Sequence, residues 1–288
     1  MHDGSRLHGI TSIVDEVVVA AIGNSGGSPA YEKVGRTGIV KKWILVDPGK
    51  VKAATMSRMA FDYQQIGQFK AEALKTVLER PFDIGCAPEI ETYTCKVEDV
   101  PVDVFKGIDL IIAGTDDRHA QNYVSRLAKQ LNIPFIAVGF HENIAGGHIQ
   151  WCVPGDGNAC YQCGPIGGRL SDDISDEDAN MTAAAGCIID GLQVDLHAAR
   201  IAISILERGR DTLMGRFYEA IKHKGYAVVT NHPEYEFGKG LMDALLGDLP
   251  TAPDKDYASE LRQYLPTGHV IWLEAGADPE CPVCGKRH

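Results

Sequence analysis

Two cysteine pairs constrain the fold of this chain more than any other feature. The sequences CYQC and CPVC form two C-x-x-C knuckles about 120 residues apart. Each knuckle presents two thiolates on a tight turn, and two knuckles complete a tetrahedral site of four sulfur ligands, which is typical of structural zinc. The pattern therefore predicts that Zn²⁺ ties the end of the chain to its middle, in a closed site without a catalytic role. The predicted ligands are Cys160, Cys163, Cys281 and Cys284.

A glycine-rich turn near the N-terminus joins an apolar run to a helix. The run Val17–Ile22 is typical of a buried parallel strand, and the turn GNSGGS follows it at once. A second apolar run ends in Asp47, about 20 residues beyond the turn. Free backbone N–H groups at a helix N-terminus bind phosphate, and a carboxylate at this spacing binds ribose. The unit therefore predicts a nucleotide-binding site, although a glycine turn between a strand and a helix can also serve packing alone. The predicted turn residues are Gly23, Gly26, Gly27 and Ser28.

Strand-like and helix-like segments alternate through the first half of the chain. This alternation predicts an open parallel sheet, whose ligands bind beyond the carboxyl ends of its strands. Asp47 and Asp116 both fall at such ends. Apolar residues recur at helical spacing within 60–80, from Phe69 to Leu78, and predict a helix there. The expected strands lie at 17–22, 43–46, 90–96, 108–113 and 134–138, and the other helices at 29–36 and 118–131.

The pattern changes after Gly146. Residues 146–164 resemble antiparallel strand and loop, 188–208 are strongly helical, and 269–274 form a strand-like run. The acidic stretch 167–180 predicts a mobile loop. We therefore predict an α/β protein with a Rossmann-like, doubly wound and mainly parallel sheet that continues into antiparallel strands and a zinc-tied C-terminal segment. We expect one domain over 1–288, with a nucleotide-binding half at 1–145 and the crossover loop, antiparallel strands and tail at 146–288.

Composition excludes some function classes. The chain has 288 residues and a formal charge of −11, which argues against nucleic-acid binding because phosphate contacts need a basic surface. No apolar run approaches the roughly 18 residues of a membrane span, and no secretory signal is visible. We therefore expect a cytoplasmic protein, in which the 8 cysteines favour metal binding or catalysis over disulfides. Cys187 precedes a predicted helix whose dipole would favour its thiolate, unless it is simply a packed thiol.

Together the motifs resemble those of the E1-like adenylating enzymes, the family of the ThiF, MoeB and HesA proteins and of the adenylation domain of ubiquitin-activating enzymes. The resemblance covers about residues 16–285 and depends on the order and spacing of short motifs. These motifs are the glycine turn with Ser28, R-x-G at Arg36 and Gly38, VDPGKV, Arg58, IGQFKAE with Lys70, AGTDD with Asp116, both cysteine knuckles and DGLQVDLHAARIAISIL.

This resemblance implies an activity and a set of residue roles. It implies an enzyme that uses ATP and Mg²⁺ to adenylate the C-terminal glycine carboxylate of a small ubiquitin-like or sulfur-carrier protein of β-grasp fold. It assigns Asp47 to the ribose, Lys70 to the phosphates and Asp116 to Mg²⁺. It matches Arg58 to the arginine of the family's N-L-x-R-Q segment. It also implies a homodimer and, where a thioester forms, an E2-like partner. Cys187 is the candidate thioester cysteine, and adenylation without a thioester is equally compatible.

Two alternatives belong to other functional classes. An NAD-dependent oxidoreductase would use Asp47 for a ribose hydroxyl equally well, but it would leave Lys70 and Asp116 without a role. A non-catalytic scaffold of the same fold would suit the glycine turn, which is one residue shorter than the family's, and Gln121, which stands where the family carries an arginine. Residue by residue, Arg58 and Lys70 are also explained as surface charges, and the two aspartates as caps or turn formers.

Overall fold

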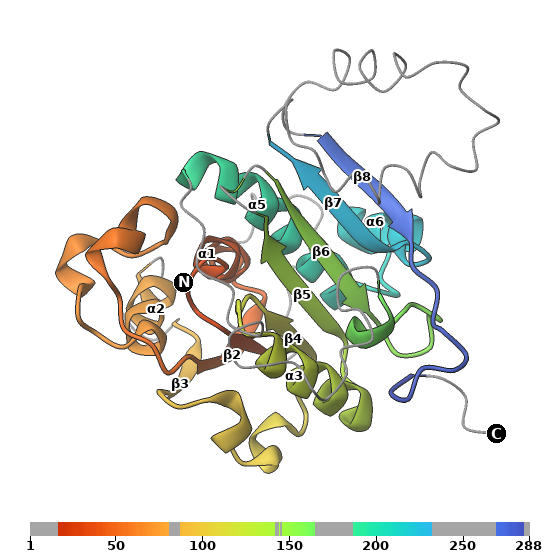
Figure 1. The fold of residues 1–288 in the computed structure, drawn as a ribbon, viewed down its shortest axis with the longest axis horizontal. Coiled ribbons are helices and arrows are strands. Elements are labelled where there is room, and N and C mark those ends of the chain that lie inside the picture. The colour runs from red at the N-terminus through yellow and green to blue at the C-terminus, as the bar shows by residue number, and fades with distance from the viewer. Residues whose placement is uncertain are drawn as a thin grey trace.

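One sheet runs through both halves of the chain. The computed structural model describes residues 17–80, 87–141, 144, 146–164, 187–231 and 269–284. Within these ranges eight strands form a single sheet in the order β3-β2-β1-β4-β5-β6-β7-β8 (Figure 1). The strands are β1 (Val17–Ile22), β2 (Val40–Val46), β3 (Glu89–Tyr93), β4 (Leu110–Ala113), β5 (Phe135–Phe140), β6 (Gly146–Cys152), β7 (Gly225–Thr230) and β8 (His269–Glu274).

The sheet changes character between β5 and β6. Strands β1 to β5 pair in parallel, and β5 to β8 pair antiparallel. This arrangement confirms the predicted α/β class and its transition near residue 146. In the parallel part the strand order reverses between β1 and β4, and ligands of doubly wound sheets bind at such a switch point. The division of the domain at residue 145 stays a prediction.

Helices cover both faces of the sheet. Alternate residues of β1 face opposite layers: Val19 and Ala21 belong to the hydrophobic cluster that includes residues of α1, α2, α5 and α6, and Ala20 and Ile22 belong to the cluster that includes residues of α3. Burial on both faces explains why the central strands are continuous apolar runs, and each buried aliphatic side chain stabilises the fold by about 1.5–3 kcal/mol. The helices are α1 (Ser28–Arg36), α2 (Lys70–Glu79), α3 (Arg118–Leu131), α5 (Ile188–Leu206) and α6 (Leu213–Ile221), with 3-10 turns η2 (Ala53–Arg58), η3 (Tyr63–Gln65), η4 (Val97–Asp99), η5 (Val102–Phe105) and η7 (Tyr161–Cys163).

The helix predicted within 60–80 is shorter than expected. Helix α2 begins at Lys70, and Phe69 is its N-cap, with 37% of its surface exposed. The preceding residues form η3, where Asp62 makes a capping box with Gln65. Gly67 then adopts a φ of +88°, which breaks any continuous helix. Phe69 therefore does not belong to the buried face on which its spacing placed it.

Some sequence predictions lie outside the described residues. The acidic stretch 167–180, which the sequence analysis predicted to be a mobile loop, is among them. Among the helices that the structure describes, none combines the length and the apolar character needed to cross a membrane.

The two adjacent aspartates after β4 have different local roles. Asp117 is the N-cap of α3, and its Oδ1 accepts hydrogen bonds from the backbone N–H groups of His119 (2.8 Å) and Ala120 (3.3 Å). Asp116 is exposed. One member of the pair therefore caps a helix, and the other is left facing solvent at the end of β4.

This difference predicts unequal effects on stability. Replacing Asp117 by Ala removes the cap and should lower the free energy of unfolding by about 1 kcal/mol. Asp116→Ala is the matched control and should change it by less than about 0.5 kcal/mol. Urea denaturation of both variants measures the difference, and equal losses would contradict the assignment of the cap.

Candidate functional site

Three loops meet at the carboxyl edge of the parallel strands. Gly23, directly after β1, donates its N–H to Val46 O at the end of β2 (2.9 Å). Gly114, directly after β4, donates to Ile22 O at the end of β1 (2.8 Å). These backbone bonds hold the glycine turn, the end of β2 and the loop 114–117 together at the switch point of the sheet.

The glycine turn fits tightly against its neighbours. Gly23 has a φ of +78°, and a Cβ there would lie 2.6 Å from the backbone N of Thr115, so only glycine fits without displacement. A Cβ on Gly26 would lie 2.7 Å from the ring of Phe140. Gly27 is the N-cap of α1 and makes no side-chain cap bond. The turn therefore leads directly into a helix N-terminus, which is a favourable place for an anion.

Asp47 is the buried carboxylate of this edge. It is 5% exposed, its Oδ2 accepts from Asn24 N (2.7 Å), and its Oδ1 accepts from Gly49 N (2.7 Å). Burial raises the pKa of Asp47, while the charge of Lys70 and the two backbone bonds oppose that rise. The carboxylate is thus fixed in orientation beside the glycine turn.

Lys70 and Asp116 lie close enough to Asp47 to act on its charge. Lys70 is the first residue of α2, and its Nζ lies 3.9 Å from Asp47 Oδ2. Its backbone N–H donates to Gly49 O (2.9 Å), which ties the start of α2 to the loop after β2. Asp116, which follows β4, contributes to raising the pKa of Asp47 by charge repulsion. One cation and two carboxylates therefore gather beside the glycine turn.

A buried serine attaches the segment that carries Arg58 to helix α1. Arg58 is half-buried at the end of η2. Two residues later, the N–H of Ala60 donates to Ser28 Oγ (3.0 Å), and Ser28 is fully buried in the first turn of α1. The Ser28 hydroxyl is therefore engaged inside the protein, where it attaches the segment carrying Arg58 to the helix that follows the glycine turn.

Cys187 lies at the start of α5. It is the N-cap of that helix and is exposed. The alternative that Cys187 is a packed thiol is therefore wrong. Asn231 Nδ2 donates to Asp190 O (2.8 Å) and to Ile144 O (3.0 Å), and thereby fixes the first turn of α5 to the segment between β5 and β6. Cys187 therefore stands at an anchored helix end.

A histidine pair that was not singled out from sequence joins the end of β5 to β6: His141 directly follows β5, and His148 lies within β6. His141 Nε2 lies 2.9 Å from His148 Nδ1, and the two rings stack. Burial lowers the pKa of His141 to about 4 and that of His148 well below its usual value, so both rings are neutral near pH 7. The pair therefore adds hydrogen-bonding groups and no charge.

Two other polar residues are buried; the sequence analysis did not single out Asn24, and it named Gln121 only as a departure from the family's arginine. Asn24 is fully buried, and its Nδ2 donates to Ala21 O (3.0 Å). Gln121 is also buried, on the inner side of α3. The available signal was a polar residue at a position where burial is expected: Asn24 lies two residues after the apolar strand β1, and Gln121 shares a helix face with Val124.

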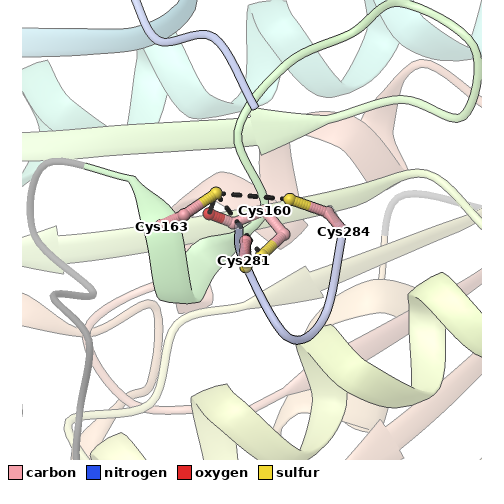
Figure 2. Close-up of side chains that lie close together, drawn as sticks. All are labelled: Cys160, Cys163, Cys281 and Cys284. Carbon is pink, nitrogen blue, oxygen red and sulfur yellow. Dashed lines mark hydrogen bonds between the residues drawn. The ribbon is translucent and has the colours of Figure 1, made fainter. Parts of the chain in front are cut away.

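The four knuckle cysteines converge as predicted (Figure 2). All four Sγ atoms lie within 4.8 Å of one another. The closest pairs are Cys163–Cys284 (3.3 Å), Cys160–Cys281 (3.6 Å) and Cys160–Cys163 (3.8 Å). A tetrahedral site with metal–sulfur bonds of about 2.3 Å places its sulfurs about 3.8 Å apart, so the cluster fits a four-coordinate metal ion.

Backbone pairing brings the tail to the first knuckle. Ala159 N donates to Ala275 O (2.7 Å), and Ala277 N donates to Gly157 O (2.9 Å). These bonds place the segment that leads into Cys281 alongside the segment that leads into Cys160. The cluster therefore needs no rearrangement of the fold to bind an ion.

Comparison with known proteins supplies relatives for this arrangement. A model of the ThiF family matches residues 16–264. The chain is 30% identical over 158 residues to ubiquitin-like modifier-activating enzyme 5 of Aedes aegypti, and 28% identical over 158 residues to that of Gallus gallus. Each alignment covers 51% of this chain and 39% of the relative, so the chain spans about two fifths of the length of these relatives.

Solved structures share the fold. The crystal structure of E. coli MccB with ATP superposes with a TM-score of 0.64 at 15% identity, and the alignment covers 93% of this chain and 67% of that one. The complex of MccB with MccA-N7isoASN gives the same TM-score and identity, with 94% and 67% covered. At this level of identity the likeness concerns the fold.

The thiolate cluster predicts a structural metal ion. We expect one metal ion per chain, and Cys281→Ser should lose it and lower the free energy of unfolding by more than about 3 kcal/mol, because binding and folding are coupled. Elemental analysis and chemical denaturation measure the two effects. Cys95→Ser, outside the cluster, should retain the ion, and an unchanged metal content in Cys281→Ser would contradict the site.

Proposed function

Because this chain belongs to the ThiF family, we propose that it is an ATP-dependent adenylyltransferase that activates the C-terminal carboxylate of a small ubiquitin-like or sulfur-carrier protein. One observation carries the proposal: Lys70 and Asp116 converge on the buried Asp47 beside the glycine turn, at the switch point of the sheet. A nucleotide needs just these groups there, namely amide donors, a cation and oriented carboxylates.

Each group has a role in nucleotide binding. The backbone N–H groups of Gly26 and Gly27, together with the N-terminus of α1, receive phosphate oxygens. Asp47, held by Asn24 N and Gly49 N, accepts from ribose hydroxyls. Lys70 extends from the first turn of α2 over the same edge, where its charge suits the phosphates.

The reaction joins two anions, so charge neutralisation dominates catalysis. A carboxylate oxygen of the acyl substrate forms a bond to the α-phosphorus, the bond from that phosphorus to the bridging oxygen breaks, and pyrophosphate leaves. The nucleophile is already ionised, so little general-base work is needed. Lys70 and Arg58 offset charge on the phosphate oxygens, and Mg²⁺ held by Asp116 would neutralise the remainder.

The cysteine cluster suits zinc. Four soft thiolates in tetrahedral arrangement are the usual ligands of structural Zn²⁺. Because the four positions are filled by protein ligands, the ion would have no open position for substrate. Its role in this proposal is to hold the C-terminal segment against the sheet.

The partners follow from the relatives. Ubiquitin-like modifier-activating enzymes act by name on ubiquitin-like modifiers, and MccB has been solved with a MccA peptide. We propose a β-grasp protein ending in glycine as the substrate, a homodimer as the assembly, and an E2-like protein as acceptor where a thioester forms. Family membership favours this reading over an oxidoreductase, and a non-catalytic scaffold remains an outcome that the first experiment distinguishes.

The proposed site predicts pyrophosphate exchange. With Mg²⁺, ATP and candidate carriers ending in glycine, the protein should exchange labelled pyrophosphate into ATP. Asp116→Asn and Lys70→Ala should each reduce the rate by about a hundredfold, because each removes charge stabilisation of about 3 kcal/mol in the transition state. Asp117→Ala is the control and should retain exchange at temperatures where it is folded. ATP binding without exchange for any carrier would favour the scaffold, and NADH binding without exchange the oxidoreductase.

The exposed thiol of Cys187 predicts where a thioester would form. Incubation with ATP and the cognate carrier should give an adduct that a reducing agent releases, and Cys187→Ala should abolish it while pyrophosphate exchange continues. Gel electrophoresis without reductant measures the adduct. An adduct that survives in Cys187→Ala would exclude this cysteine.

A further inference from the structure

The first cysteine knuckle is hydrogen-bonded to helix α3. Tyr161 lies between Cys160 and Cys163, is 2% exposed, and packs edge-on against Phe135 with ring centroids 6.5 Å apart. Its hydroxyl donates to Gln121 Oε1, in the first half of α3. Its backbone N also lies 3.4 Å from Ser125 Oγ, one turn further along the helix. A residue inside the metal knuckle is therefore bonded at two points to α3.

Gln121 is also hydrogen-bonded to the loop after β4. It is 5% exposed, and its Nε2 donates to Thr115 O (2.7 Å). The amide of a single side chain thus joins the Tyr161 hydroxyl on one side to the backbone beside Asp116 on the other. Thr115 Oγ1 in turn accepts from Asp117 N (3.1 Å), which completes the loop.

The loop needs this support because Asp116 itself is exposed. An exposed side chain is positioned by its backbone, and here the backbone at Thr115 packs against Gly23 so closely that a Cβ would lie 2.6 Å away. A shift at Thr115 would therefore move both Asp116 and the glycine turn. Removing the Tyr161 hydroxyl leaves a buried amide oxygen without its donor, and such a loss is costly inside a protein.

We propose that Tyr161 and Gln121 are positioning residues for Asp116, and that they couple the filling of the four-cysteine site to the binding of Mg²⁺ and nucleotide. The coupling deepens the adenylyltransferase assignment and rests on it for the role of Asp116. Coupling of two binding sites is reciprocal, so Mg²⁺ with nucleotide should also tighten metal binding by the cysteines.

Hydrogen exchange tests the mechanical link without any ligand. In Tyr161→Phe, which keeps the ring and removes the hydroxyl, the peptide covering residues 113–117 should exchange several-fold faster than in the wild-type protein. Gln121→Met should show the same increase, and the double variant little more, because both changes break one pathway. Tyr218→Phe is the matched control: it removes a tyrosine hydroxyl bond to Asp156, which lies outside the path from Tyr161 through Gln121 to Thr115, and it should leave this peptide unchanged.

Magnesium titration tests the functional coupling. With nucleotide at a fixed concentration, Tyr161→Phe should raise the apparent dissociation constant for Mg²⁺ about fivefold, as expected for one lost hydrogen bond. Tyr218→Phe should leave it unchanged, and both variants should retain one metal ion per chain. Removing the cysteine-bound metal from the wild-type protein should also raise the apparent dissociation constant for Mg²⁺. The same removal should raise it less in Tyr161→Phe, where the link is already broken.

The outcomes separate this inference from the proposed function. Unchanged exchange of residues 113–117 in both Tyr161→Phe and Gln121→Met would overturn the link, whatever nucleotide binds. Faster exchange with an unchanged Mg²⁺ constant would overturn the coupling. If the variants exchange faster but the wild-type protein binds no Mg²⁺ and nucleotide, the positioning of the loop is supported. The absence of binding would then refute the adenylyltransferase assignment.

Discussion

The arrangement of the carboxyl edge of the parallel strands depends on the buried carboxylate of Asp47 and its partners. A charge removed from water is unfavourable unless it is paired, and here two backbone N–H groups and Lys70 share that task. The partners come from the glycine turn, the loop after β2 and the start of α2. Because one side chain contacts three segments, the same bonds that hold these segments together also orient the carboxylate.

Close backbone contacts also connect the loops on both sides of the switch point. Gly23 allows the turn after β1 to approach the loop after β4, and Ser28 attaches the segment that carries Arg58. On the other face, Gln121 connects that loop to Tyr161 within the cysteine knuckle. The edge and the cysteine cluster therefore share one helix, α3, as their common support.

Predictions from sequence succeeded where burial imposes a regular pattern. The strand β1 and the helix α3 have the bounds expected, because a strand buried on both faces is continuously apolar and a half-buried helix repeats with its own period. The pattern was misleading at Phe69, where apolar spacing continued beyond the helix into turns. Spacing alone does not distinguish a buried apolar residue from an exposed one that caps a helix.

The fold class, the four clustered cysteines and the charged residues at strand ends could be predicted from the sequence alone, because they depend on local pattern and residue chemistry. How these residues are connected became visible only in the folded chain. The use of Ser28 to hold Ala60, and the bond that joins Tyr161 to Gln121 and through it to Thr115, depend on contacts between segments far apart in the sequence. Such contacts leave no periodic trace in the chain, because each is a single hydrogen bond that only the packed fold brings within reach.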